Sequence, residues 1–176
     1  WQFFRDRRPE IYGDLTALIL FIVASFTDFL DGMLARMLGE ESKLGELLDP
    51  IADKIIVATA LILLVMDGTI RHYEVIAAII ILTREILISG LREFLAKGRI
   101  KLPVSNLAKL KTVLQMVSIA LLLSGETGNK IINFQDYNAQ TIGIILLWLS
   151  AFLTLFTGYD YMRKGIDHAM SEDNKD

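Results

Sequence analysis

Two pairs of aspartates are the residues whose types and spacing most clearly predict chemistry. Asp28 and Asp31 stand at i and i+3, and Asp49 and Asp53 stand at i and i+4. On α-helices these spacings place each pair on one face. The polar segment Gly39-Glu40-Glu41-Ser42 indicates a turn between two antiparallel helices. Folding about that turn would bring the two pairs opposite each other at matching depths.

Four facing carboxylates repel one another, and either protonation or bound cations would relieve the repulsion. Donor sets made only of oxygen suit Mg²⁺, Mn²⁺ or Ca²⁺ rather than softer metals. Two rigid helices could hold two such ions about 4 Å apart, which is the layout used for displacement at phosphorus. Beside the acids, Gly32 and Ala35 leave open surface, and Arg36 offers a forked donor for a phosphate or carboxylate.

The same residues also have structural explanations. Asp28 or Asp31 could pair with Arg36 or Lys54. Gly32 and Ala35 could allow close helix packing, and Asp49-Pro50 could mark the start of a helix. These explanations act independently, so the coincidence of four acids on facing stripes favours the metal site.

The elements that must position these acids have the composition of membrane helices interrupted by charge. Hydrophobic residues make up 53% of the 176 residues, and the mean hydropathy is +0.44. Only Ala139–Tyr159 is an uncharged run of roughly the 20 residues that a span needs. Four other segments reach that length only by including ionisable groups, which are costly in lipid and typical of functional sites. We predict an all-α polytopic membrane bundle, one domain over 1–176, with five helices at roughly 14–37, 44–66, 73–97, 103–124 and 138–163.

The last of these helices decides between a membrane bundle and a soluble all-α bundle. Ala139–Tyr159 shows no polar stripe, and its large apolar residues point all round the helix, which fits lipid better than one buried face. Before it, Gly125-Glu126-Thr127-Gly128-Asn129 is predicted to begin a long polar link. After it, the charged tail from Arg163 to Asp176 is predicted to fray.

Composition excludes several other classes. The absence of Cys rules out disulfides and thiolate metal sites, and the net charge of −3 gives no basic excess for nucleic acid, so we expect no nucleic-acid partner. Lys97, Arg99 and Lys101 lie in one connection, and Arg163-Lys164 begins the tail. Both fall on the same side of an alternating five-helix bundle, so that side is predicted to face the cytoplasm.

The full pattern is Asp28-x2-Asp31-Gly32-x2-Ala35-Arg36-x8-Gly45-x3-Asp49-x3-Asp53, which resembles without departure the signature of the CDP-alcohol phosphotransferase family. The resemblance implies a membrane-embedded homodimer of six-helix protomers, with the first helix expected upstream of Trp1. Enzymes of this family displace CMP from a CDP-linked lipid or alcohol with a second alcohol. The resemblance implies two divalent cations, Mg²⁺ or Mn²⁺, bound by Asp28, Asp31, Asp49 and Asp53. It also implies Asp53 as the general base, and a CDP site lined by Asp31, Gly32, Ala35 and Arg36.

Further motifs are similar to the phosphatidylglycerophosphate synthase branch of the family. They are Thr83-Arg84-Glu85-Ile86, Ser89-Gly90-Leu91-Arg92-Glu93, Val104-Ser105 and Leu107-Ala108-Lys109-Leu110-Lys111-Thr112. The implied reaction converts CDP-diacylglycerol and sn-glycerol 3-phosphate to phosphatidylglycerophosphate and CMP. It implies a bacterial plasma (inner) membrane, with the active site facing the cytoplasm.

A glycerol 3-phosphate acceptor carries a dianion, so its pocket needs several cations. The expected acceptor phosphate-binding residues are Arg84, Arg92, Lys109 and Lys111. The two lysines lie on nearly opposite sides of a helix, so only one is expected to face the site. A Glu85–Arg92 ion pair is an alternative for Arg92, and snorkelling to anionic lipid headgroups is an alternative for the lysines.

Two other functions stay open at this point. A relative with another acceptor would make cardiolipin, phosphatidylserine or a phosphatidylinositol phosphate. A divalent-cation transporter could use the aspartates as its ion site, although Gly32, Ala35 and Arg36 would then have no reason to accompany them. No residue is an evident nucleophile, so a single displacement is favoured over a covalent intermediate.

Overall fold

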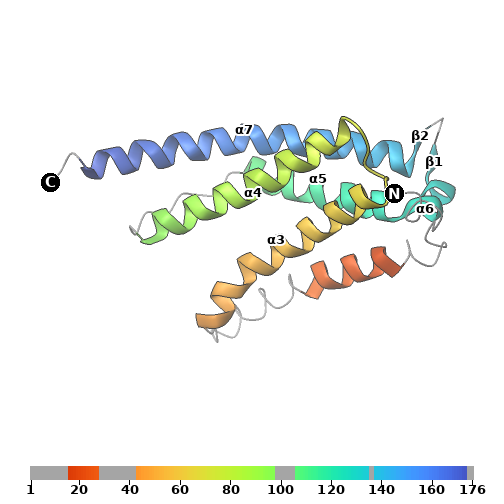
Figure 1. The fold of residues 1–176 in the computed structure, drawn as a ribbon, viewed down its shortest axis with the longest axis horizontal. Coiled ribbons are helices and arrows are strands. Elements are labelled where there is room, and N and C mark those ends of the chain that lie inside the picture. Colours follow the sequence, from red (N-terminus) through yellow and green to blue (C-terminus); the bar gives the residue numbers. More distant parts are fainter. Residues whose placement is uncertain (1–15, 28–42, 98–105, 135–136, 174–176) are drawn as a thin grey trace.

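The computed structural model describes residues 16–27, 43–97, 106–134 and 137–173, and it is built of helices (Figure 1). The helices are Thr16–Thr27, α3 (Lys43–Met66), α4 (Glu74–Lys97), α5 (Asn106–Leu123), α6 (Gly125–Ile131) and α7 (Ala139–Asp173). Two short antiparallel strands, β1 (Asn133–Phe134) and β2 (Tyr137–Asn138), pair before α7. The all-α prediction is confirmed apart from this two-residue pair.

Three of the predicted helices closely match the structure. The ranges 44–66, 73–97 and 103–124 correspond to α3, α4 and α5. Of the first predicted helix, 14–37, the structure describes Thr16–Thr27 as helical, and the rest lies outside the described residues.

The link before α7 was predicted as polar loop, and that prediction is wrong over α6. The chain bends by 101° between Leu107–Leu123 and Gly125–Ile131, where Gly125 takes a φ of 52° that a residue with a side chain rarely adopts. The new helix is joined to the start of α7, because the Gln140 backbone N–H donates to Asn129 Oδ1 at 3.0 Å. The composition of this segment indicated a polar link, but the bend at Gly125 and the contact with α7 accompany a short helix there.

The predicted fraying after Arg163 is also wrong, since α7 continues to Asp173. Contacts with α4 extend into this segment. Tyr161 is buried, and Gly165 lies so close to α4 that a Cβ there would stand 3.1 Å from Leu91. Packing on a neighbouring helix therefore outweighs the charge of this segment.

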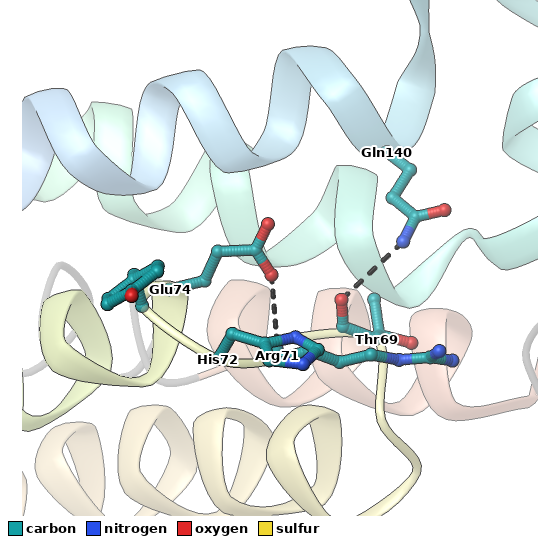
Figure 2. Close-up of a pocket in the computed structure, with 6 residues that line it drawn as sticks. Thr69, Arg71, His72, Glu74 and Gln140 are labelled. Atoms are coloured by element: carbon teal, nitrogen blue, oxygen red, sulfur yellow. Dashed lines mark hydrogen bonds between the residues drawn. The ribbon is translucent and has the colours of Figure 1, made fainter.

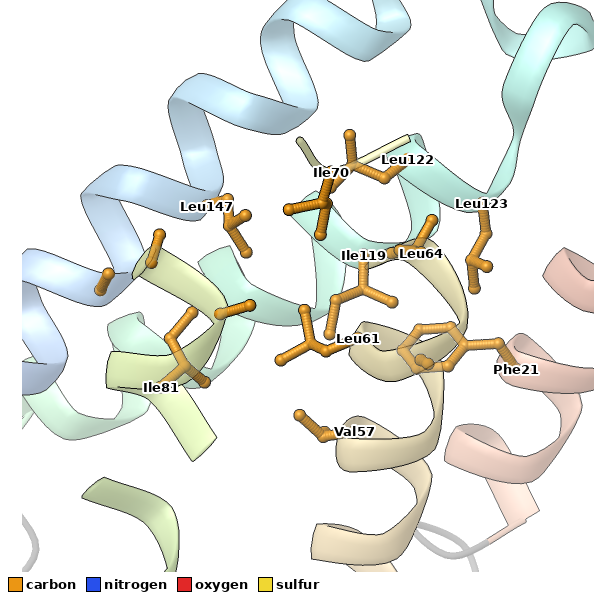
Figure 3. Packing of buried hydrophobic residues seen from close by; sticks show 14 residues of the cluster. Phe21, Val57, Leu61, Leu64, Ile70, Ile81, Ile119, Leu122, Leu123 and Leu147 are labelled. Atoms are coloured by element: carbon orange, nitrogen blue, oxygen red, sulfur yellow. The ribbon is translucent and has the colours of Figure 1, made fainter. Parts of the chain in front are cut away.

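The hydrophobic core lies where α3, α4, α5 and α7 converge, with Phe21 packing in from Thr16–Thr27 (Figure 3). Leu61, Ile81, Ile119 and Leu147 are fully buried, and each comes from a different helix. The α3–α4 turn contributes Ile70, which is 1% exposed. This core fixes the four helices near one end of the bundle.

The inner face of α7 corrects the expectation that this helix has no polar stripe. Small and polar residues recur along it and are buried: Gly143, Ser150, Thr154, Thr157 and Gly158. Small residues let helix backbones approach closely. The outer face carries large exposed apolar residues: Ile145, Trp148, Leu149, Phe152, Leu155 and Phe156.

Among the described residues, Ala139–Arg163 is long and apolar enough to cross a membrane. The bent α5–α6 pair counts as a second crossing only if it is one span. The lower hydropathy elsewhere follows from charge, since α3 carries acids in its first half and α4 carries Arg84, Glu85 and Arg92. Five spans therefore stay a prediction.

Candidate functional site: the aspartate helix and a buried cation cluster

Helix α3 carries one half of the predicted metal site. Gly45, Asp49 and Asp53 follow one another at i, i+4 and i+8 on this uninterrupted helix, so they share one stripe. The side chains of Asp49 and Asp53 lie outside what the structure describes. So does the other half of the site, Asp28, Asp31, Gly32, Ala35 and Arg36. The facing of the four acids stays a prediction.

Elsewhere the described side chains do not offer a rival metal site. No group of three or more His, Cys, Asp or Glu residues gathers among them. The chemistry of the predicted donors fits hard divalent cations, because all four are carboxylates. The aspartates of the signature remain the residues that could hold a metal.

Two of the predicted acceptor residues, Arg84 and Lys111, fall in a largely buried cluster of charged groups where α4, α5 and α7 meet. Glu85 of α4 is its centre: Lys111 Nζ from α5 bonds to Glu85 Oε1, and Arg84 Nη1 lies 3.6 Å from the same oxygen. The Arg84 side chain is 12% exposed and the Lys111 side chain 6%. Two buried cations thus share one carboxylate, which leaves a positive charge for an anionic ligand.

Helix α7 holds the other side of Arg84. The Arg84 Nη2 group donates to Thr157 Oγ1 at 3.1 Å. The Thr157 hydroxyl in turn donates to the Leu153 carbonyl at 2.8 Å, so its oxygen is left to accept from the guanidinium. Arg84 Nε is buried without a hydrogen-bond partner among the described residues. This N–H lies against Gly158 of α7, 3.2 Å from where a Cβ of that residue would stand.

Arg92 contacts the Tyr161 ring and not Glu85, the acid that the sequence analysis considered as its partner. Its Nη2 group donates to Tyr161 Oη at 3.1 Å, and its Cζ lies 5.1 Å from the centre of the Tyr161 ring. Glu85 pairs instead with Arg84 and Lys111. Arg92 remains more exposed than those two cations, so part of its guanidinium is accessible.

The two lysines of α5 separate as expected from their angular positions. Lys111 is buried, with 4% of the residue exposed, and lies in the cluster. Lys109 is exposed. Of the four predicted acceptor residues, the structure brings Arg84 and Lys111 together around Glu85. Arg92 of α4 packs against the face of α7 that Arg84 also contacts. The structure leaves Lys109 outside the cluster.

Sequence reasoning missed the contribution of α7 to this cluster. Thr157 and Tyr161 stand at i and i+4, so they lie on the same face of the helix. Polar groups on one face of an otherwise apolar segment are the available signal, because such groups are costly in lipid unless they have partners. Ser150 and Thr154 continue the stripe.

The first half of α3 and the second half of α7 lie toward the same end of the bundle (Figure 1). The aspartates are in the first half of α3, and Thr157 and Tyr161 are in the second half of α7. Helices α4 and α7 run in parallel, because Arg84 meets Thr157 and Leu91 meets Gly165. One end of the molecule thus carries both the α3 part of the predicted metal site and the predicted acceptor-binding residues around Glu85.

A pocket of about 490 Å³ lies at the opposite end, around the α3–α4 turn (Figure 2). Its lining residues are Thr69, Arg71, His72, Tyr73, Glu74 and Gln140. The Arg71 backbone N–H donates to Glu74 Oε2 at 2.8 Å, and Gln140 Nε2 reaches the Thr69 carbonyl at 3.5 Å. None of the predicted site residues lines it, so we do not place the reaction there.

The aspartate stripe on a helical bundle defines a class of protein, and the comparison with known families agrees. The family model for CDP-alcohol phosphatidyltransferase matches residues 3–156, and the chain belongs to this family.

Curated relatives extend the match. A protein of Rickettsia bellii (strain RML369-C) is 44% identical over 145 residues, which cover 82% of this chain and 76% of the relative. A protein of Cereibacter sphaeroides is 37% identical over 201 residues, covering 97% and 90%. One from Yersinia enterocolitica is 34% identical over 160 residues, covering 88% and 80%. Each is named CDP-diacylglycerol–glycerol-3-phosphate 3-phosphatidyltransferase.

Proposed function

We propose that this chain transfers the phosphatidyl group of CDP-diacylglycerol to sn-glycerol 3-phosphate, giving phosphatidylglycerophosphate and CMP. The observation that carries the proposal is the agreement in name among relatives that match at least 82% of the chain. The aspartate signature stands complete within the matched residues 3–156. The chain is an enzyme of phospholipid biosynthesis.

The acids of the signature have distinct roles in this proposal. Asp28, Asp31, Asp49 and Asp53 hold two divalent cations, Mg²⁺ or Mn²⁺. Bound there, the cations neutralise the pyrophosphate and make CMP a better leaving group. The CDP site is formed by Asp31, Gly32, Ala35 and Arg36. Arg36 supplies paired N–H donors to a phosphate, and Gly32 and Ala35 leave room for the nucleotide.

The reaction is a single displacement at phosphorus. The Asp53 carboxylate accepts the proton of the glycerol 1-hydroxyl. The oxygen then forms a bond to the phosphorus that carries diacylglycerol, while the bond from that phosphorus to the CMP oxygen breaks. The electron pair leaves with CMP, so atoms and charge balance without a covalent enzyme intermediate.

The cation cluster binds the phosphate of the acceptor. Arg84, Arg92 and Lys111 bring three positive charges, of which Glu85 offsets one. A dianionic phosphomonoester neutralises the remaining two. Lys109, which is exposed on α5, contacts lipid headgroups instead.

The outer surface supports a place in the membrane. Large apolar side chains stand out from the bundle, with Ile86 69% exposed on α4 and Phe152 67% exposed on α7. Exposed apolar surface of this extent marks contact with lipid or protein. We propose a multi-pass homodimer in a bacterial plasma membrane, with the aspartates and the cation cluster toward the cytoplasm.

The test is CMP release by the purified chain in mixed micelles of CDP-diacylglycerol. We expect release that depends on glycerol 3-phosphate and on added Mg²⁺ or Mn²⁺, and that stops with EDTA. Parallel reactions contain phosphatidylglycerol, serine or inositol phosphate as acceptor. Release with one of these and not with glycerol 3-phosphate would assign a different acceptor. Metal flux into liposomes without CMP release would indicate a transporter.

A further inference from the structure

We propose that Thr157, Gly158 and Tyr161 of α7 are positioning residues that fix Arg84 and Arg92 for the acceptor phosphate. The inference rests on the proposed function, because it assigns these arginines to phosphate binding. It adds a specificity role for the last helix, whose three residues lie within little more than one turn. Neither the aspartate signature nor the matched segment 3–156 includes them.

Thr157 sets the direction of the Arg84 guanidinium. Glu85 draws the Nη1 side of the group at 3.6 Å, and Thr157 Oγ1 accepts from the Nη2 side at 3.1 Å. The Thr157 side chain is itself fixed, since its hydroxyl donates to the Leu153 carbonyl and the residue is 4% exposed. A guanidinium held at both ends has one orientation, and bidentate recognition of phosphate depends on orientation.

Gly158 provides the space in which the Arg84 side chain lies. A Cβ at this position would stand 3.1 Å from Arg84 Cγ and 3.2 Å from Arg84 Nε. These distances are shorter than ordinary van der Waals contact, so an alanine at this position would push the Arg84 side chain by a few tenths of an ångström. Gly158 is buried. Its lack of a side chain therefore serves Arg84 directly.

Tyr161 holds Arg92 in two ways at once. The ring lies under the guanidinium at 5.1 Å, and the ring hydroxyl accepts from Nη2 at 3.1 Å. Tyr161 is 4% exposed, so it is a buried support for an arginine that is itself exposed. Without it, Arg92 would lose the contacts that hold it on the face of α7 that also carries Thr157.

The test compares KM values for the two substrates across variants of the full chain in mixed micelles. Thr157→Val removes the hydroxyl at nearly constant volume, and Thr157→Ser keeps it. We expect Thr157→Val to raise KM for glycerol 3-phosphate roughly 3- to 10-fold, which is the net contribution of one ordinary hydrogen bond, because the lost bond orients Arg84 and does not itself contact the phosphate. The KM for CDP-diacylglycerol should not change. Thr157→Ser should restore most of the affinity.

The glycine and tyrosine variants test the other two contacts. Gly158→Ala should raise KM for glycerol 3-phosphate several-fold. Gly165→Ala is its matched control, because it makes the same change on the same helix against Leu91 and not against an arginine. Tyr161→Leu should raise this KM more than Tyr161→Phe, which keeps the ring and loses the hydroxyl.

A second readout separates this inference from the proposed function. Glycerol 3-phosphate and inorganic phosphate should raise the Tm of the wild type and of Gly165→Ala, but much less that of Thr157→Val. If the wild type makes no CMP with glycerol 3-phosphate, the proposed function fails, and this Tm pattern would still support the positioning role. Equal changes in both KM values, or unchanged KM and Tm responses in Thr157→Val and Tyr161→Leu, would overturn it.

Discussion

Helices α4, α5 and α7 build two different interiors at their two ends. Toward α6 they enclose apolar side chains such as Ile81, Ile119 and Leu147, all fully buried. Toward the other end the same helices enclose Lys111, whose side chain is 6% exposed, with Arg84 and Glu85 partly buried beside it. The backbone arrangement continues from one end to the other, while the chemistry of the contacts changes from apolar to ionised.

The two ends of the bundle separate the contacts that stabilise the fold from the contacts that we assign to substrate binding. Apolar packing is roughly proportional to buried area and tolerates substitution at constant volume. A buried charge is costly unless it is paired, so it is retained where a function needs it. We therefore expect substitutions at the apolar end to change stability and substitutions at the ionised end to change substrate kinetics. Four predictions test this division.

The largest effect is expected for Asp53→Asn. Loss of the proposed general base should lower kcat roughly 10²- to 10⁴-fold. The amide has almost the same volume, so the Tm of the protein without ligand should change little. Initial rates of CMP release and a thermal unfolding curve test both parts. A turnover near that of the wild type would remove the base assignment.

The next effect is expected at the apolar end, for Leu147→Ala. Removing a fully buried leucine should lower the free energy of unfolding by about 2–5 kcal/mol. Leu149→Ala, two residues on and 45% exposed, is the matched control and should cost much less. Both variants should keep the wild-type KM for each substrate, measured below the unfolding temperature. A selective rise in KM for glycerol 3-phosphate in Leu147→Ala would break the division.

A smaller effect is expected for Arg84→Ala. Loss of the guanidinium should raise KM for glycerol 3-phosphate roughly 10- to 100-fold, the range for hydrogen bonds to a charged group. The free energy of unfolding should fall only slightly, because Glu85 keeps its ion pair with Lys111 and the Thr157 hydroxyl keeps its bond to the Leu153 carbonyl. The KM for CDP-diacylglycerol is the internal control. A parallel rise in that KM would assign Arg84 a structural role.

The smallest effect is expected for Lys109→Ala, set against Lys111→Ala. Lys109 is exposed and should be nearly neutral for both KM values, whereas Lys111 is buried against Glu85 and its loss should weaken glycerol 3-phosphate binding. Vesicles with and without anionic lipid test the remaining role of Lys109 at headgroups. Equal kinetic effects of the two substitutions would contradict the positions of the lysines in the cluster.

The sequence predicted the helices well where one signal dominated. Helix α3 ends at Met66, which is the predicted residue, and the Gly68 φ of 82° in the turn that follows shows why glycine stands there. It failed where tertiary contact decides. No local sequence signal predicts that Gly165 packs on Leu91, yet such contacts keep α7 helical past Arg163.

The candidate site was predicted in the same uneven way. Angular spacing correctly separated Lys109 from Lys111, since the helix geometry alone requires it. The partners of the cations were not predictable, because Glu85 had several cations within reach along the chain. Only the crossing of α4 with α7 selects Tyr161 for Arg92. The arrangement of the aspartates around metal stays a prediction from spacing and family.

The length of α7 has a consequence for the water-facing side of the protein. At about 1.5 Å per residue, its 35 residues make a rod of roughly 50 Å, whereas a bilayer's hydrocarbon layer is about 30 Å thick. In the proposed membrane placement, the apolar stretch ends at Arg163 and the helical turns from there to Asp173 extend on the order of 15 Å beyond the lipid. A fluorophore attached at the end of these turns would report the height of the membrane surface beneath the active end.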